Sequence, residues 1–399
     1  MDLPVLSAIE LLAVEHIRKH GAMSRTDLAK FLDISRASVT AIVGKLLEEG
    51  ILAEIGHGKS IGGRRPLILD INPAFGYVVG VDIGATSVDL ALADFSGKIL
   101  SRESFMADVR VKPEVLLGRI NQVVLAMLEA KEAKPEQVLG YGMGVPGPVQ
   151  YPEGLLIQPP LMPAWEGFPI KAYINNQFPQ VVACIDNDVN IMAVGEARAG
   201  GGFGLENFMY VKIGTGIGCG VIMHGEIYRG SDGCAGDIGH ICIDYNGPVC
   251  HCGNTGCLEF MAAGPAIAEM AKQAAENGES QLLAKRMAEN DGTLTSIDVG
   301  ELAAAGDRAS NLIINESGKM IGGVLAGLVN FYNPEAIFIG GGVSKIGNQF
   351  LSTIRQFTLR RATALSTKAL RIDYSKLGDD AGVHGAIWLA LENIFTPVK

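Results

Sequence analysis

Apolar side chains recur with the period of an α-helix in three successive segments of residues 1–50. A serine stands before each segment (Ser7, Ser24 and Ser35), and an acidic residue follows three positions after the first two of these serines. Serine caps helices at their N-termini, and an acidic residue three positions later completes a capping box. A glycine follows the first and the third segment, as is common where helices end. The pattern predicts three short helices.

The third of these segments has the two faces expected of a helix that reads DNA. Its apolar residues form one stripe: Val39, Ile42, Val43, Leu46 and Leu47. The opposite face carries small and hydrogen-bonding residues, which let a helix come close to base edges in the major groove. We therefore predict a recognition helix in which Arg36, Thr40 and Lys45 contact DNA.

The segment 51–71 is typical of two short strands around a glycine-rich, basic tip. Arg64 and Arg65 at this tip suit phosphates or a narrow minor groove. Three helices followed by such a wing predict a winged helix-turn-helix DNA-binding domain over residues 1–72. The alternative is a three-helix protein-interaction module with a solvated loop, and the basic tip favours DNA.

From Tyr77 onward the pattern changes to that of strands. Residues 77–100 are typical of a strand, a glycine turn and a second strand; a looser version recurs at 208–228, and a third strand with a glycine turn at 337–344. Such turns expose backbone N–H groups and admit a phosphate, although each turn alone is equally typical of a hairpin without a ligand. The candidate nucleotide-binding residues are Asp82, Gly84, Thr86, Gly214, Thr215, Gly216, Gly341 and Gly342.

Composition and charge narrow the class of protein. A length of 399 residues indicates two or three domains, and 48% hydrophobic with 19% charged residues is typical of a globular chain. No run approaches the roughly 20 apolar residues of a membrane span, and the N-terminus lacks a secretion signal, so we expect a cytoplasmic protein with no membrane partner. The net charge is −10, but residues 1–72 hold nine basic and nine acidic residues, so any DNA contact belongs to this neutral head.

Cys250, Cys252 and Cys257 lie in one glycine-rich stretch together with His240 and His251. This stretch is compatible with a metal site, a redox centre or disulfides. The chain has seven cysteines, an odd number, and the other four stand singly in apolar or glycine-rich surroundings. In a reducing compartment single cysteines are mostly small buried hydrophobes, so a metal site is favoured over disulfides.

Together these segments resemble the ROK family (repressors, open reading frames and sugar kinases) over essentially the whole chain. The matching motifs are DIGAT (82–86), GMGVPGPV (142–149), GTGIG (214–218), GDIGH (236–240), CHCGNTGCLE (250–259) and IGGGVS (339–344). The resemblance implies an α/β body with the two-lobed actin-like (ribonuclease H-like, hexokinase-type) ATPase fold. The lobes would span residues 73–190 and 191–399, with the C-terminal helix returning to the first lobe. The winged head resembles the family's regulators of the xylose and N-acetylglucosamine repressor type, because the stand-alone kinases lack it.

The same resemblance implies the roles of the site residues. His240, Cys250, Cys252 and Cys257 match the family's structural zinc site, with His251 as the rival imidazole ligand. The implied sugar-binding residues are Asn187, Asp188, Asp237, His240 and Glu259. Asp188 matches the general base of the family's kinases, and in a repressor it would only bind the sugar.

The expected function is that of a sugar-responsive transcriptional regulator, a repressor of carbohydrate-utilisation genes and not an enzyme. It would bind operator DNA through residues 1–72 as a homodimer or homotetramer, with a sugar in the interlobe cleft and a structural zinc ion. The first alternative is an ATP-dependent sugar kinase that carries a head and uses Mg-ATP. The family's kinases have Glu where this chain has Asp237, and a polar Asn-Leu pair where it has Leu161-Met162, which weakens this alternative. The second alternative is a regulator that answers to a partner protein.

Overall fold

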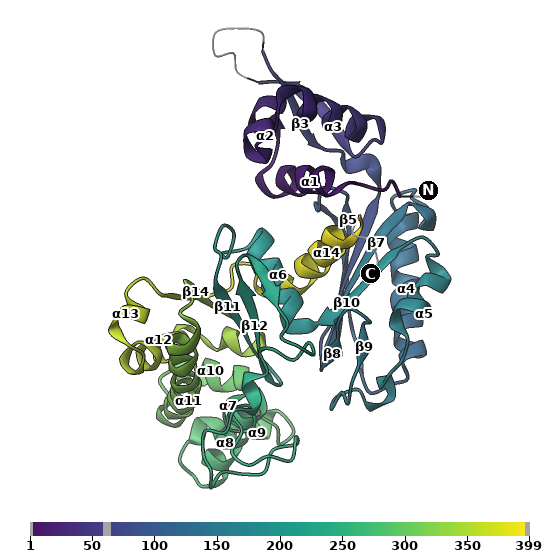
Figure 1. The fold of residues 1–399 in the computed structure, drawn as a ribbon. Helices are drawn as coiled ribbons and strands as arrows, with labels where there is room; N and C mark the ends of the chain where they lie inside the picture. Colours follow the sequence, from purple (N-terminus) through teal and green to yellow (C-terminus); the bar gives the residue numbers. More distant parts are fainter. Residues whose placement is uncertain (1–2, 59–64, 396–399) are drawn as a thin grey trace.

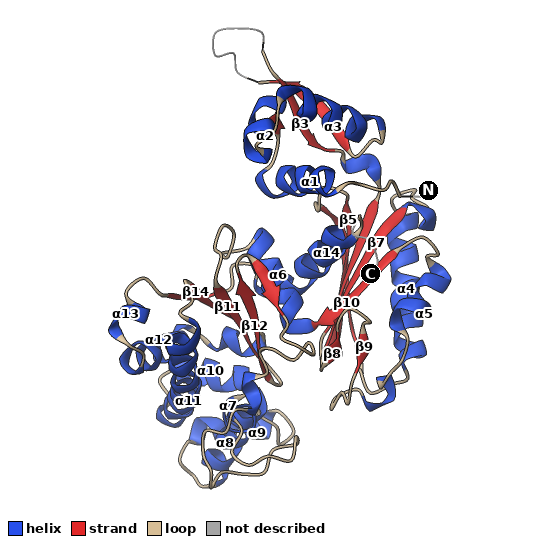
Figure 2. Cartoon of the chain, viewed as in Figure 1, coloured by secondary structure: helices blue, strands red, loops and turns tan. Residues whose placement is uncertain are grey.

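The structure is a computed structural model that describes residues 3–58 and 65–395. A small head of helices and a short sheet stands above two α/β lobes (Figure 1). Each lobe has one five-stranded sheet with helices packed on it (Figure 2). The expected α/β class, with a winged head and a two-lobed body, is confirmed.

The head contains the three predicted helices and a wing. Its helices are α1 (Ala8–His20), α2 (Arg25–Leu32) and α3 (Arg36–Glu48), and its strands are β1 (Met23–Ser24), β2 (Leu52–His57) and β3 (Leu67–Ile71). The strands pair antiparallel in the order β1-β3-β2. Ser7, Ser24 and Ser35 accept hydrogen bonds at the three helix starts, and Ser7 forms a full capping box with Glu10. The local signals in the sequence therefore determined where each helix begins.

The first lobe is built around a mixed sheet in the order β10-β7-β4-β5-β6. Its strands are β4 (Tyr77–Ile83), β5 (Ser87–Asp94), β6 (Ile99–Met106), β7 (Val138–Val145) and β10 (Val182–Asn187). Helices α4 (Pro113–Glu129) and α5 (Ile170–Gln177) cover one face, and a small hairpin of β8 (Val149–Gln150) and β9 (Leu155–Leu156) extends from it. The predicted strand–turn–strand unit at 77–100 is β4 and β5, which pair antiparallel.

The second lobe has the sheet order β13-β12-β11-β14-β15. Its strands are β11 (Phe208–Ile213), β12 (Ile217–Met223), β13 (Glu226–Tyr228), β14 (Ala336–Gly340) and β15 (Arg371–Tyr374). Its helices are α7 (Leu258–Ala262), α8 (Gly264–Glu276), α9 (Gln281–Glu289), α10 (Ser296–Ala304), α11 (Arg308–Tyr332), α12 (Asn348–Arg361) and α13 (Ala364–Thr367). Both further strand–turn units predicted from the sequence are present, as β11–β12 and as β14 with its turn.

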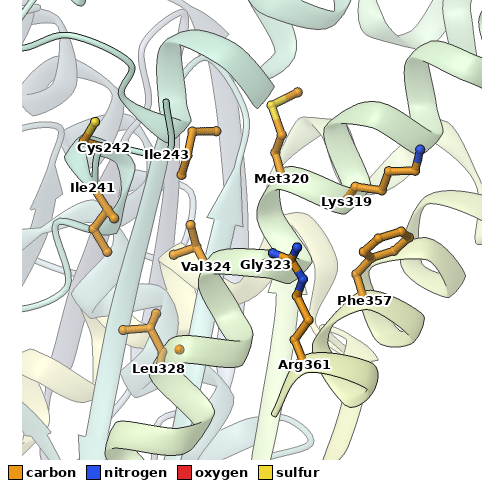
Figure 3. Close-up of a pocket in the computed structure, with 11 residues that line it drawn as sticks. Ile241, Cys242, Ile243, Lys319, Met320, Gly323, Val324, Leu328, Phe357 and Arg361 are labelled. Atoms are coloured by element: carbon orange, nitrogen blue, oxygen red, sulfur yellow. The ribbon is translucent and has the colours of Figure 1, made fainter. Parts of the chain in front are cut away.

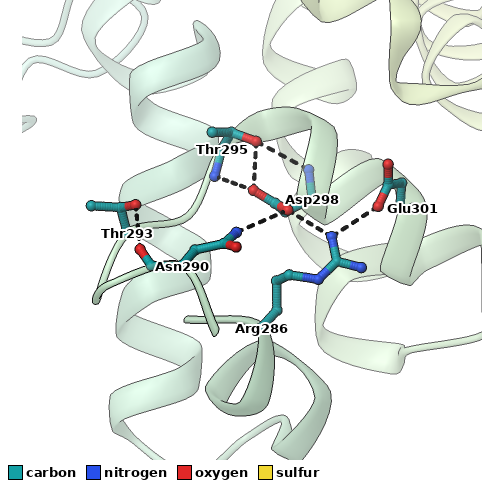
Figure 4. Close-up of polar contacts among 6 residues, drawn as sticks. All are labelled: Arg286, Asn290, Thr293, Thr295, Asp298 and Glu301. Carbon is teal, nitrogen blue, oxygen red and sulfur yellow. Dashed lines mark hydrogen bonds and ion pairs between the residues drawn. The ribbon is translucent and has the colours of Figure 1, made fainter. Parts of the chain in front are cut away.

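A polar network joins α9 to α10 in this lobe (Figure 4). Thr295 caps α10 by accepting from the Asp298 backbone N–H at 3.2 Å. Arg286 on α9 donates to Asp298 at 2.6 Å and to Glu301 at 2.8 Å. These contacts fix the loop between two helices and belong to the structure of the lobe.

Helix α11 is the one helix in the described residues that is long and apolar enough to span a membrane by length and composition. Half of its most apolar window is buried in the second lobe, where Ile314, Ile321 and Leu325 belong to the core. This burial accounts for its apolar composition.

The last helix, α14 (Ala381–Asn393), packs on β4 and β7 of the first lobe. It also packs against α6 (Asp188–Ala199), which follows β10 and reaches the second-lobe strand β12. The boundary expected at residue 190 therefore falls inside α6, and this helix contacts both lobes.

The head is not a separate globule, because its core is continuous with the first lobe. Val14 and Ile17 of α1 belong to the same buried cluster as Phe95 of the first lobe and Ile387 of α14. The buried Arg18 guanidinium lies 4.8 Å from the centre of the Phe95 ring and donates to the Leu391 carbonyl at 3.3 Å. The boundary expected at residue 72 therefore separates the last strand of the head from the first lobe, but it does not separate two hydrophobic cores.

Candidate functional site: the interlobe cleft and its Cys3His cluster

The four predicted metal ligands come together in the second lobe. His240 ends a short helical turn (Ile238–His240), and Cys257 directly precedes α7. The ligand atoms of His240, Cys250, Cys252 and Cys257 all lie within 4.8 Å of one another. Nδ1 of His240 is 3.7 Å from Sγ of Cys250, and the Sγ atoms of Cys252 and Cys257 are also 3.7 Å apart. Three thiols and one imidazole at this spacing form a closed four-ligand set that could hold a metal ion.

The rival imidazole, His251, is engaged elsewhere. Its ring packs edge-on against Phe260, with the ring centres 5.4 Å apart. Of the other four cysteines, which we expected to be small buried residues, Cys184 and Cys219 are buried. Cys234 and Cys242 are exposed, so the expectation is wrong for these two.

The second ring nitrogen of His240 points toward the predicted sugar side. Nε2 lies 3.9 Å from Oδ1 of Asp237, whose side chain is 60% exposed. Glu259, in the first turn of α7, accepts a hydrogen bond from the Ile217 backbone N–H at 2.8 Å. The cluster, two predicted sugar-binding carboxylates and the β11–β12 turn therefore form one connected unit of the second lobe.

Asn187 and Asp188 lie at the N-terminus of α6, between the lobes. Asn187 caps the helix through Oδ1, and its Nδ2 donates to the Gly147 carbonyl of the GMGVPGPV motif at 3.0 Å. Asp188 is buried, and its Oδ2 lies 2.5 Å from Nζ of Lys212 on β11. Lys212 was not among the residues predicted from the sequence. The available signal was one charged residue within the apolar strand FMYVKI, directly before the GTGIG turn.

Asp82 on β4 is a second buried carboxylate near this ion pair. Its Oδ1 has no hydrogen-bond partner among the described residues. Burial raises the pKa of Asp82 to about 7; Lys212 counteracts this rise, and Asp188 adds to it. Gly382 of α14 packs directly on this carboxylate, because a Cβ at Gly382 would lie 1.8 Å from Oδ2 of Asp82.

The two predicted phosphate turns face one another. A cavity of about 710 Å³ is lined by Thr86 of the first turn and Thr215 of the second, so the cleft runs between the lobes. Leu161, which the sequence predicts to replace a polar sugar contact of the kinases, also lines this cavity and is 44% exposed. Met162 is fully buried in the first-lobe core.

The first two turns are closed by backbone hydrogen bonds, from Gly84 N–H to Ser87 and from Gly214 N–H to Gly216. The third turn lies against the second. Gly341 has a φ of 85°, a left-handed conformation that favours glycine, and a Cβ there would meet the Ile213 carbonyl at 2.5 Å. Gly342, which follows it, begins a short helical turn.

The predicted DNA contacts lie on the head. Arg36 and Thr40 are exposed on α3, and Arg65 is exposed beside β3. Lys45 is half-buried and forms an ion pair with Glu10 of α1 at 2.9 Å. Its contact with DNA stays a prediction, because Lys45 would have to leave Glu10 to make it. Arg64 lies outside the described residues.

A second cavity, of about 670 Å³, lies between α11, α12 and residues 241–243 (Figure 3). Met320, Val324 and Leu328 form its apolar wall, and Lys319 and Arg361 stand at its edges. None of the predicted site residues is among the described residues that line this groove.

The raised pKa of Asp82 predicts a pH dependence of stability. A carboxylic acid whose pKa is about 7 in the fold, against about 3.9 unfolded, stabilises the fold at low pH and loses this contribution as the pH rises through 7. Relative to Asp82→Asn, the wild type should therefore lose up to about 1.4 kcal/mol of unfolding free energy per pH unit between about pH 4 and 7. Urea unfolding at several pH values measures this difference, with the exposed Asp291→Asn as control. Parallel pH profiles for wild type and Asp82→Asn would contradict it.

Comparison with known proteins places this architecture in a family. The sequence model of the ROK family matches residues 78–393, and that of the MarR family matches residues 6–53. The xylose repressor of Caldicellulosiruptor bescii is 31% identical over 388 residues, which cover 97% of this chain and 96% of that protein.

Solved structures extend the comparison. A ROK family transcriptional regulator, described as a homologue of the E. coli MLC protein, superposes with a TM-score of 0.83 at 25% identity and covers 97% of both chains. A ROK family glucokinase from Streptomyces griseus, in complex with glucose and AMPPNP, has a TM-score of 0.69 at 29% identity. It covers 79% of this chain and 99% of its own. This chain, with its winged helix-turn-helix head, two-lobed body and Cys3His cluster, belongs to the ROK family.

Proposed function

We propose that this protein is a sugar-responsive transcriptional repressor that acts in the cytoplasm. The observation that carries the proposal is the combination of a winged head with a sugar-kinase-like body. The head presents an exposed face of α3, and its core is continuous with that of the body. A xylose repressor and a regulator structure match nearly the full length, head included, whereas the glucokinase structure covers 79% of the chain. An aldose such as xylose is the ligand class that these relatives favour.

The proposed response depends on which parts move together. Because the head shares its core with the first lobe and α14, it follows the first lobe as one body. Asp237 and Glu259 belong to the second lobe, and Asn187 and Asp188 lie between the lobes. A sugar bound by both groups would favour the closed arrangement of the lobes, and so change the spacing of two heads on a palindromic operator. This mechanism requires a homodimer or a homotetramer.

We assign zinc to the Cys3His cluster. The donor set fits this metal, because three thiols and one imidazole are soft and borderline ligands and leave no open coordination position. Bound zinc would fix His240 through Nδ1 and leave Nε2 free to face Asp237 and the sugar. Its role is structural, since it would brace the turn that carries Asp237 against α7, which carries Glu259.

The second candidate function is that of a sugar kinase using Mg-ATP. Asp82, Thr86 and Asp188 are retained, and Thr86 and Thr215 line one cavity, which favours this candidate. The ion pair of Asp188 with Lys212 and the apolar Leu161 at the cleft disfavour it. We therefore propose the regulator as the main function.

The repressor proposal predicts a DNA affinity that depends on the head and on sugar. A DNA site is first selected in vitro from genomic fragments with the full-length protein. The double variant Arg36→Ala/Arg65→Ala should weaken binding to this site and reduce its salt slope, whereas Arg110→Ala, an exposed arginine of the first lobe, should not. Fluorescence anisotropy at fixed salt measures both.

In the same assay, D-xylose, D-glucose and N-acetyl-D-glucosamine are each added at saturating concentration. The sugar that the protein recognises should change the wild-type affinity for DNA by roughly 5–150-fold. Glu259→Gln should keep the sugar-free affinity and lose the response, because the head is unchanged. Unchanged DNA binding with a sugar that calorimetry shows to be bound would refute the regulatory role of the cleft. Unchanged binding by the double head variant would refute the DNA-reading face.

The cluster predicts about one zinc ion per chain in purified protein. Cys252→Ser should lose the metal and much of the thermal stability, because removing one ligand opens the shell. Cys234→Ser changes an exposed thiol outside the cluster and should keep both. Mass-spectrometric metal analysis with thermal unfolding measures the effect. A metal-free wild type with unchanged stability would contradict the assignment.

A further inference from the structure

Two carboxylates and one ammonium lie close enough to interact electrostatically at the α6 side of the cleft. Asp82 comes from β4 of the first lobe, Asp188 from the start of α6, and Lys212 from β11 of the second lobe. The Lys212 side chain is 21% exposed and that of Asp188 is 8% exposed, with Nζ and Oδ2 2.5 Å apart. Burial alone would lower the pKa of Lys212, but Asp188 and Asp82 together raise it above its ordinary value. Lys212 is therefore a permanent cation near both carboxylates.

The backbone makes room for this lysine. Lys212 is paired with Gly218 on β12 and with Gly340 on β14, so neither neighbouring strand places a side chain beside it. Gly218 also lets α6 come close, because a Cβ there would lie 2.9 Å from Cγ2 of Val189. The strand pairing thus directs Lys212 at the start of α6, where Asp188 lies.

This arrangement does not fit a divalent metal. Mg²⁺ requires near-octahedral oxygen ligands and is usually held by one or two carboxylates. Here three carboxylates lie near one another: Asp82, its cross-strand neighbour Asp89, and Asp188. Asp89 accepts from the Ser87 hydroxyl at 3.5 Å, and Asp188 is already bound to an ammonium, which has three donors and no lone pair for a metal. Asp82 is buried with an unpartnered oxygen, and its raised pKa keeps it partly protonated at neutral pH, so it is a weak metal ligand.

We propose that Lys212 is a resident cation that takes the place of Mg²⁺ between Asp82 and Asp188, so that this side of the cleft binds its ligands without a divalent metal. While Asp188 is bound to Lys212, it does not accept a proton from a sugar hydroxyl. Lys212 is thus a specificity-determining residue that separates sensing from phosphoryl transfer. The inference rests on the proposed regulatory function, but its test uses neither DNA nor sugar, so the two can fail independently.

The test counts Mn²⁺, a paramagnetic probe with oxygen-ligand preferences like those of Mg²⁺, by electron paramagnetic resonance on full-length, zinc-replete protein. Four proteins are compared in millimolar Mn²⁺: wild type, Asp82→Asn, Lys212→Met, and Asp82→Asn/Lys212→Met. Wild type and Asp82→Asn should bind equal amounts, held only by surface acidic residues. Lys212→Met should bind about one additional Mn²⁺ per chain, and the double variant should lose it. Lys285→Met, which removes an exposed lysine paired with Glu289, should match the wild type.

Two results would overturn the proposal. The first is that the wild type binds about one Mn²⁺ per chain more than Asp82→Asn does, because a metal would then occupy the site beside Lys212. This arm needs no lysine variant and stays decisive if Lys212→Met does not fold. The second is a folded Lys212→Met, verified by its thermal transition, that binds no more Mn²⁺ than the wild type.

Discussion

The buried contact between α1, β5 and α14 is the constraint on which the rest of this molecule depends. Phe75, Phe95 and Phe395 form an aromatic group there, with ring centres 4.8 to 6.1 Å apart. Arg18 of α1 reaches across this group to the Leu391 carbonyl. Burial makes the contact costly to open, because the apolar area would return to water and Arg18 would lose its ring and carbonyl partners. The head therefore has a fixed orientation on the first lobe.

This constraint gives α14 a central position. It packs on the first-lobe sheet, on the head and on α6, and the α6 residue Arg198 binds Glu392 of α14 at 2.5 Å. The start of α6 carries Asp188, which binds Lys212 of the second lobe. A path of packed helices and ion pairs thus runs from the proposed sugar-binding residues to the head that we propose reads DNA. In the regulator that we propose, relative motion of the lobes would reach the head through these contacts.

Local signals made much of this structure predictable. The serine caps located the head helices, and the glycine turns located the hairpins of both lobes, because turns and caps depend on residues a few positions apart. The four predicted metal ligands also lie within 18 residues, from His240 to Cys257, and their ligand atoms lie within 4.8 Å of one another.

Long-range pairing was not predictable in the same way. Lys212 and Asp188 meet only after α6 and β11 have packed together, and Lys45 meets Glu10 only after α3 has packed on α1. The shared core of head and first lobe was missed for a related reason. Its residues are ordinary apolar positions of separate elements, and no pattern within one element reveals its partner.

The central claim is that the head and the first lobe form one cooperative unit. Native-state hydrogen exchange of the full-length protein tests it directly, by comparing the opening free energies of the slowest amides in α1 of the head and β5 of the first lobe. The account predicts equal free energies for both elements, because the shared core must open for either to exchange. Opening of α1 at a free energy several kcal/mol below that of β5 would contradict it, since the head would then unfold while the body stays intact.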